Sequence, residues 1–285
     1  MAELVTQGSR RLGGYLRELR DACKKTLEEV AAHLDQDKGT ISRYEGGRLK
    51  PKWPVVVMLT NLYGATDEQA ERVRELYEAA KSEPKPVRLP SGTPSAFRRL
   101  VYETGVAWRM RQVGGGLVPG LLQNDKYMQA LRATLADPES AQPKHFGVRN
   151  KRQKRIDPTD PKPLIYHVIM DEIAVTRQVG GAEVLLDELH HLADVAENWE
   201  NVTVQIVPKE AGDYGCGAGG MTVVDYDNSE PSWVYFESLA DSHLVDNPED
   251  VQRFAELFDR AARIALSPDK SIEFIRQQIE VLEKS

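Results

Sequence analysis

The chain has 285 residues, of which 41% are hydrophobic and 28% charged, a composition typical of soluble globular proteins. Its length favours two domains of roughly 100–200 residues each. No apolar run reaches the roughly 18 residues of a membrane span. The N-terminus lacks the pattern of a secretory signal, and two cysteines exclude a disulfide framework. A reducing cytoplasm is the expected location.

The net charge of −7 is unevenly distributed along the chain. Residues 9–52 carry eleven Lys and Arg against seven Asp and Glu, a net of +4. Residues 87–285 carry 22 against 30, a net of −8. The overall acidity argues against a general nucleic-acid binder, whereas the local basic excess fits a small module that binds a polyanion.

A series of short helices is predicted at the N-terminus. Leu12, Leu16 and Leu19 fall on one face of a first helix by the 3.6-residue period. Thr26 and Glu29 match the S/T-x-x-E capping box, which satisfies free N–H groups at the start of a second helix.

The third and later helices are delimited by capping residues and glycines. Asp37 is a favourable N-cap for a third helix from Lys38 to about Glu45, which two glycines end. Pro54 suits the first turn of a fourth helix. A second capping box at residues 66–69 opens a charged fifth helix that runs to about residue 81.

Residues 82–95 contain four prolines and predict a boundary between domains, because proline removes backbone donors and fixes φ. The remaining chain mixes helical and strand-like patterns, so it predicts an α+β or mixed α/β domain. We expect helices at 96–112, 124–136, 139–155, 182–197, 248–266 and 270–283. We expect strands at 164–170, 202–208, 221–226 and 233–238.

The third predicted helix carries the candidate functional residues. At 100° per residue, four polar or small residues lie within an arc of about 140°, while Thr40, Ile41 and Tyr44 lie on the opposite side. An exposed basic face of this kind fits the major groove of B-DNA, where Arg and Lys contact guanine and Ser contacts a base or a phosphate. The candidate base-reading residues are Lys38, Gly39, Ser42 and Arg43.

Candidate phosphate contacts flank this helix. Arg48, Lys50 and Lys52 lie in the loop that follows it. Thr26 opens the second helix, whose free N–H groups attract a phosphate. A small helical bundle that does not bind DNA would also have amphipathic helices with solvated basic residues. The prediction therefore depends on the joint occurrence of the capping box, short turn, basic third helix, glycine stop and basic loop.

The segment LRELRDACKKTLEEVAAHLDQDKGTISRYEGGRLKP resembles the helix-turn-helix of the Cro and lambda-repressor (Xre) superfamily. The shared features are Leu-Arg-x-x-Arg in the first helix, Glu-Val-Ala in the second, Thr-Ile-Ser-Arg in the third and the terminal Glu-Gly-Gly. The resemblance implies that Arg20 pairs with Glu45 and that the four base-reading positions are those named above. Asp35 replaces the usual turn glycine, although Asp tolerates the left-handed conformation better than most residues. Leu27 replaces the usual polar residue at the start of the second helix.

Residues 98–283 resemble the C-terminal domain of WhiJ-like regulators of actinomycetes. The motifs that carry this resemblance are LVPGLLQNDKYMQAL, DEIAVTRQVGG, VTVQIVPKEAGDYG, VYFES and ALSPDKSIEFIRQQ, in this order. The resemblance implies an antitoxin-like pairing with a small BldB-like protein, and it reveals no ligand.

Four other features have alternative interpretations. His190 and His191 indicate either a metal site or, more simply, an exposed helix surface. Asp171 and Glu172 follow a strand and indicate either a functional carboxylate pair or the start of a helix. Residues 144–155 carry six Lys and Arg, which indicate a second nucleic-acid contact, a solvated helix face or a docking site for an acidic partner.

The fourth feature, the glycine-rich stretch 211–220, lacks a phosphate-binding motif and predicts a loop between strands in which Cys216 is exposed.

The sequence therefore predicts a multidomain chain. An all-α helix-turn-helix domain spans 9–81, a Pro-rich linker 82–95, and an α+β (mixed α/β) domain for dimerisation, regulation and partner binding 96–285. The expected function is transcription regulation by a homodimer that binds double-stranded DNA at a palindromic operator. We expect no enzymatic activity, cofactor, metal or membrane association. Two alternatives remain open: an antitoxin-like adaptor for a small partner protein, and a repressor that senses a small molecule.

Overall fold

The computed structural model describes residues 5–82, 89, 93–134, 146–216, 219–227, 230–237 and 242–284. The chain divides into two compact units, Met1–Arg88 and Leu89–Ser285. Separate clusters of buried apolar side chains form the cores of the two units. Most of the predicted linker at 82–95 lies outside the described residues.

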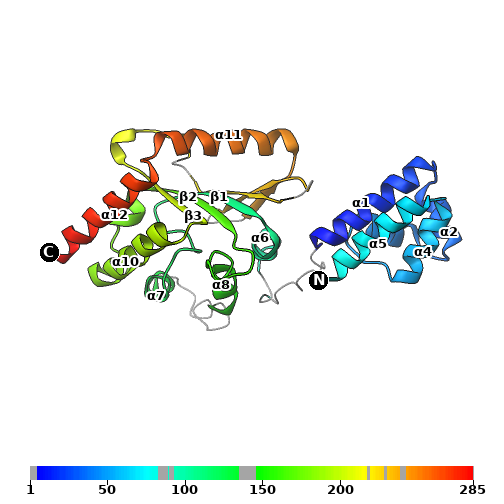
Figure 1. Ribbon diagram of the computed structural model, residues 1–285, viewed down its shortest axis with the longest axis horizontal. Coiled ribbons are helices and arrows are strands. Elements are labelled where there is room, and N and C mark those ends of the chain that lie inside the picture. Colours follow the sequence, from blue (N-terminus) through cyan, green and yellow to red (C-terminus); the bar gives the residue numbers. More distant parts are fainter. Residues whose placement is uncertain are drawn as a thin grey trace. The chain divides into compact units, whose positions relative to one another are not determined.

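The first unit is a helical bundle (Figure 1). Its core is built from apolar residues at helical spacing, among which Leu12, Leu16, Ile41 and Leu59 are fully buried. In the part of this unit that the structure describes, the helices are α1 (Gln7–Ala22), α2 (Leu27–His33), α3 (Lys38–Glu45), α4 (Trp53–Leu62) and α5 (Asp67–Ser82).

The helix boundaries follow from local capping chemistry. Thr26 and Glu29 form a complete capping box at the start of α2, and the Asp37 side chain accepts a hydrogen bond from the Thr40 N–H at the start of α3. The turn between these helices contains Asp35 in the left-handed conformation, with a φ of 51°. Gly47 follows α3 with a φ of 65°, which glycine adopts without steric cost.

The second unit is built around a mixed six-stranded sheet with strand order β3-β2-β1-β4-β5-β6. The three strands β1, β2 and β3 are parallel, whereas β4, β5 and β6 are each antiparallel to the preceding neighbour. The strands are β1 (Arg109–Gly114), β2 (Ile165–Asp171), β3 (Val202–Val207), β4 (Met221–Asp225), β5 (Trp233–Glu237) and β6 (Ser242–Val245).

Helices cover both faces of this sheet (Figure 1). On one face, Phe258 of α11 packs with Val113 and Ile169. On the other, helices α6, α7, α10 and α12 contribute to a larger core around Tyr166 and Val168. The helical segments are α6 (Ser95–Val106), α7 (Asp125–Ala133), α8 (Phe146–Gln153), α9 (Ile173–Thr176), α10 (Ala182–Asn198), η2 (Lys209–Ala211), α11 (Pro248–Ile264) and α12 (Pro268–Glu283).

The predicted fold class, an all-α unit followed by a mixed α/β unit, is confirmed. The helix predicted at 96–112 is wrong beyond Val106, because Arg109–Gly114 forms strand β1 near the centre of the sheet. This segment contains only one β-branched residue, and its pairing with β2 and β4 determines its conformation. Strand β6 was not predicted, whereas α9 follows Asp171 and Glu172, for which the start of a helix was one of two interpretations. Residues 135–145, which include parts of two predicted helices, lie outside the described residues.

Cys216 is another correction. It is buried with 6% exposure, because its loop packs against the core beside α11. Desolvation raises the pKa of this thiol.

Candidate nucleic-acid interface

The candidate base-reading residues share the solvent-exposed face of α3. The side chains of Lys38 and Arg43 are 59% and 52% exposed. Gly39 and Ser42 are also exposed, whereas Thr40 and Ile41 on the opposite side are buried. The helix therefore packs through one side and presents the other to solvent, as a recognition helix must.

An ion pair fixes the C-terminal end of α3 to α1. Arg20 of α1 donates from Nε and Nη2 to the two carboxylate oxygens of Glu45, at 2.6 and 2.9 Å. The Arg20 Nη1 group also donates to the Lys25 carbonyl at 2.8 Å. These bonds raise the pKa of Arg20, since they favour its charged form. The structure thus brings Arg20 and Glu45 together in a bidentate geometry that restrains the orientation of α3.

Two glycines allow α1 and the end of α3 to approach closely. A Cβ atom on Gly13 would lie 2.4 Å from the Tyr44 carbonyl oxygen and 2.6 Å from that of Glu45. A Cβ atom on Gly47 would lie 2.8 Å from the backbone of Ser9 and Arg10. Gly13 is a positioning residue that was missed in the sequence, where the only signal is a glycine inside a helical pattern.

The exposed cations of α3 already have partners within the unit. Arg43 donates from Nη2 to the Thr40 hydroxyl at 2.8 Å and lies 3.9 Å from the carboxylate of Asp37. Lys38 forms an ion pair with Glu28 of α2 at 2.5 Å, which lowers the pKa of Glu28. Apart from Thr40, all these groups are exposed to solvent. Their contacts are therefore weak and can exchange for contacts to DNA.

The backbone and side-chain groups of Thr26 are occupied by Glu29. The Thr26 N–H and hydroxyl donate to Glu29 Oε2 at 2.7 and 3.0 Å, and the hydroxyl accepts from the Glu29 N–H. These bonds lower the pKa of Glu29, so a carboxylate occupies the start of α2. The predicted phosphate contact by Thr26 would require Glu29 to move away.

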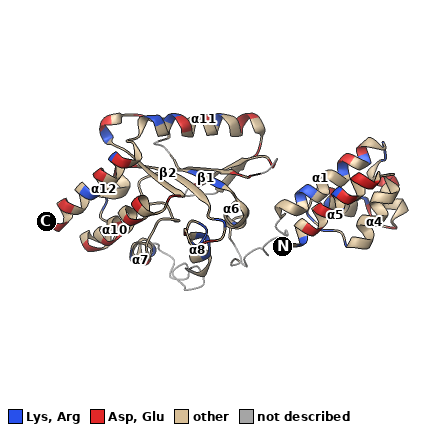
Figure 2. Cartoon of the chain, in the orientation of Figure 1, with Lys and Arg blue, Asp and Glu red and all other residues tan. Residues whose placement is uncertain are grey.

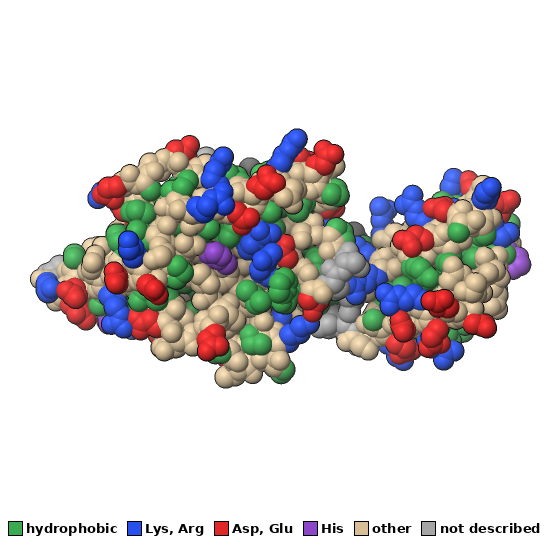
Figure 3. Space-filling view, turned by 45° about the horizontal axis from the view of Figure 1, so that its top comes forward, with side chains coloured by type: hydrophobic (Ala, Val, Ile, Leu, Met, Phe, Trp, Pro, Cys, Tyr) green, Lys and Arg blue, Asp and Glu red, His purple; other side chains and the backbone are tan. Residues whose placement is uncertain are grey.

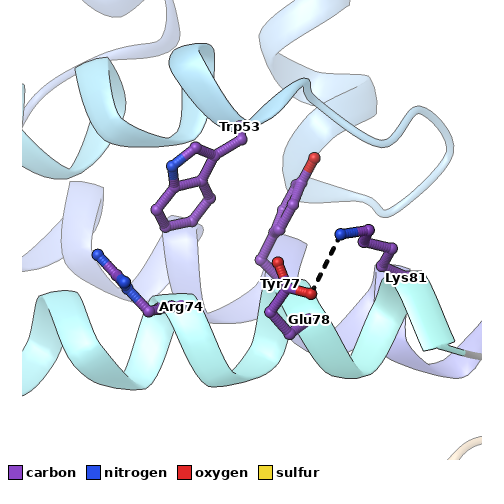
Figure 4. A pocket seen from close by; sticks show the side chains of 5 residues that line it. All are labelled: Trp53, Arg74, Tyr77, Glu78 and Lys81. Carbon is purple, nitrogen blue, oxygen red and sulfur yellow. Dashed lines mark hydrogen bonds and ion pairs between the residues drawn. The ribbon is translucent and has the colours of Figure 1, made fainter.

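The three other candidate phosphate ligands, Arg48, Lys50 and Lys52, are exposed in the loop between α3 and α4. The Lys50 ammonium lies 5.9 Å from the centre of the Tyr77 ring. Tyr77 packs at 5.0 Å from Trp53, and the two rings line a cavity of about 450 Å³ together with residues of α5 (Figure 4). The Tyr77–Trp53 pair therefore packs against the loop that carries Lys50.

The other sequence features occupy different places in the second unit. Asp171 and Glu172 accept backbone hydrogen bonds from Ile173 and Lys209, as expected of residues that begin a helix and fix a turn. His190 lies 3.7 Å from Glu283 on α12. Within the described residues, no group of three or more His, Cys, Asp or Glu side chains has the arrangement of a metal site. Of the basic stretch 144–155, residues 144 and 145 lie outside the described residues. Lys151 and Lys154 are exposed, as a solvated helix face requires, whereas Arg149, Arg152 and Arg155 are half-buried.

Charges of both signs are interspersed on the surface. Figure 2 shows basic residues on α1 and α8, while α10 carries acidic residues and no Lys or Arg. The face drawn in Figure 3 has neighbouring Lys/Arg and Asp/Glu side chains on both units. No described helix combines the length and the apolar character that crossing a membrane requires.

Comparison with known protein families gives two matches. Residues 11–73 match a helix-turn-helix domain, and residues 97–277 match a domain of unknown function, DUF5753, which covers more than half of the chain. The chain belongs to the DUF5753 family. No curated protein and no solved structure matches the chain.

The two matches fall on different units of this DUF5753 protein. The first unit is a helix-turn-helix domain, the kind of module with which regulators bind DNA. The exposed face of α3 carries guanidinium, ammonium and hydroxyl groups, and the loop after α3 carries three exposed cations.

Proposed function

We propose that the protein is a sequence-specific transcription regulator that acts in the cytoplasm as a homodimer and works by binding rather than by catalysis. The observation that carries this proposal is the face of α3, where Lys38, Ser42 and Arg43 are exposed while the Arg20–Glu45 pair restrains the helix behind them. Arg43 reads guanine, and the loop cations hold the DNA backbone.

A two-fold dimer would place two copies of α3 about 34 Å apart, in successive major grooves on one side of the duplex. The operator is therefore palindromic or nearly so. The second unit provides the dimer contacts and receives the regulatory input. Its resemblance to WhiJ-like regulators supports a small BldB-like protein as the partner that delivers this input.

The proposal is tested by selecting an operator from random duplexes and measuring binding by fluorescence anisotropy. Arg43→Ala should lower affinity for the selected operator by roughly 5- to 150-fold per protomer, the equivalent of one guanine contact of about 1–3 kcal/mol in each half-site, with little effect on random DNA. Lys50→Ala should weaken binding to both alike and reduce the salt slope by about 0.9 per protomer. Arg17→Ala, which removes a 68% exposed arginine of α1, is the matched control.

Unchanged operator selectivity in Arg43→Ala would contradict the assignment of α3 as the reading helix. Absence of DNA binding by the wild type at low salt would contradict the function itself. Insertion of five base pairs between the operator half-sites should abolish cooperative binding, because it rotates the half-sites to opposite sides of the duplex. A monomeric complex on a single half-site would contradict the dimer.

A further inference from the structure

Two arginines of α8 are partly enclosed by the second unit rather than fully exposed on its surface. Arg149 and Arg152 are three residues apart and therefore share one side of the helix. Both are half-buried, whereas Lys151 between them is exposed. Helix α8 lies on the side of the sheet opposite α11, close to α6 and α7 (Figures 1 and 2).

The hydrogen-bond partners of these two arginines are neutral. Arg152 donates from Nε to the Thr104 hydroxyl at 3.2 Å. Arg149 donates to the side-chain oxygen of Gln123, whose amide nitrogen is held by the Val118 carbonyl at 2.6 Å. Considering the described residues alone, neither guanidinium forms an ion pair with a carboxylate. Most of their donor groups therefore remain available.

Arg155 shows how the same segment satisfies a structural arginine. Its guanidinium pairs with Asp160 at 2.8 Å and also donates to the carbonyl groups of Thr104, Ala107 and Lys162. Arg155 thus has a counter-charge and several backbone acceptors. Arg149 and Arg152 each have one neutral hydrogen-bond partner and no ion pair among the described residues, and the charge of Glu237 acts on both without direct contact. These contacts do not fully account for their charge.

Electrostatics at this place disfavour positive charge in the absence of an added anion. Burial, followed by the charges of Arg132 and Arg152, lowers the pKa of Arg149 to about 10 and outweighs the effect of Glu237 and Glu188. Burial also raises the pKa of Glu188 to about 8, so this carboxyl is mainly protonated at neutral pH and does not supply a counter-charge. Buried charges without partners are strongly destabilising.

Solvent reaches polar side chains on the face of the sheet that lies toward α8. Gln112, Thr222 and Tyr235 are register partners across β1, β4 and β5. Gln112 is only half-buried although β1 lies inside the sheet, so the helices leave part of this face accessible. The Gln112 side chain accepts a hydrogen bond from the Tyr166 hydroxyl, and Tyr166, Tyr235 and Glu237 lie within electrostatic range of Arg152. Polar groups and two guanidinium groups therefore converge at an accessible place.

We propose that Arg149 and Arg152 bind the carboxylate or phosphate group of a small anionic molecule within the DUF5753 unit. We call this place the arginine site, made of Arg149, Arg152, Thr104 and Gln123. Guanidinium groups suit both anions because their planar donors match the paired oxygens. The proposal does not depend on DNA binding by the first unit.

The test is calorimetric unfolding of the full chain, with chloride replaced by inorganic phosphate or by citrate at constant ionic strength. At ten times the dissociation constant, the anion should raise the Tm of the second unit by roughly 3–6 °C. Arg149→Gln and Arg152→Gln should lose this rise. Lys151→Gln removes the same charge from the exposed side of α8 and should keep it, as should Arg43→Ala in the first unit.

Hydrogen exchange of the wild type gives a readout that is independent of the variants' folding. Phosphate or citrate should slow exchange at residues 146–153. A response to phosphate alone assigns a phosphate ligand, and a response to citrate alone assigns a carboxylate. The proposal is overturned if both anions act like chloride on Tm and exchange, or if Lys151→Gln loses the response as the arginine variants do.

Discussion

Replacing Arg20 by Ala should destabilise the first unit much more than replacing Glu45 by Ala, although the two residues form one ion pair. The Glu45 side chain is only 6% exposed, and both its oxygens accept from Arg20. Arg20→Ala therefore leaves a buried carboxylate without its partner, at a cost of about 3–5 kcal/mol. Glu45→Ala leaves Arg20 bonded to the Lys25 carbonyl and paired with Asp21 at 2.7 Å. The cost in that case is roughly 1–2 kcal/mol.

Removal of both partners should be less harmful than removal of Arg20 alone, because no buried charge remains. The assay is hydrogen exchange of amides in α1 and α3, which reports the free energy of unfolding of this unit within the full chain. Three variants are compared with the wild type: Arg20→Ala, Glu45→Ala and the double variant. Equal losses in the two single variants, or a double variant less stable than Arg20→Ala, would refute the reasoning.

Three further predictions concern packing, DNA affinity and pH. Gly13→Ala should destabilise the first unit by about 1–3 kcal/mol, since the added Cβ would lie 2.4 Å from the Tyr44 carbonyl oxygen. Gly14→Ala meets nothing within 4 Å and should stabilise it by up to about 1 kcal/mol, so a similar thermal midpoint for both variants would contradict the packing argument. Glu28→Gln should raise affinity for random DNA about two- to five-fold at low salt, because it removes a negative charge and releases Lys38; an unchanged anisotropy titration would count against this. Burial raises the pKa of Glu188 from 4.5 to about 8, so the folded chain retains a proton that the unfolded chain loses. Stability should therefore fall between about pH 4.5 and 8, and Glu188→Gln should recover roughly 2–5 kcal/mol of it at pH 8, measured by denaturant unfolding at pH 5 and pH 8. Identical pH dependence in the variant would exclude this origin.

The N-terminal helices could be predicted from sequence because local chemistry determines them. The capping boxes, the Asp37 N-cap and the glycine after α3 act within a few residues, and each is found where it was predicted. Strand β1 could not be predicted in this way. Its conformation depends on pairing with β2 and β4, which lie more than fifty residues away in the chain. Arg109 and Arg111 also bind Asp225 of β4. The partial burial of Arg149 could not be predicted either, because it depends on packing between distant segments. Locally, six basic residues in twelve are typical of a solvated helix.

The internal contacts of the α3 cations bear on how such a surface would distinguish DNA sequences. To reach a base as proposed, Lys38 and Arg43 would each have to leave a contact within the unit, to Glu28 and to Thr40. On a non-cognate sequence these contacts compete with phosphates, and the acidic groups beside α3 repel the duplex. On the operator, a bidentate guanine contact of about 1–3 kcal/mol exceeds the weak exposed contact that Arg43 gives up. If α3 reads bases as proposed, affinity for random DNA would therefore be reduced more than affinity for the operator, and the acidic neighbours would contribute to specificity without touching a base.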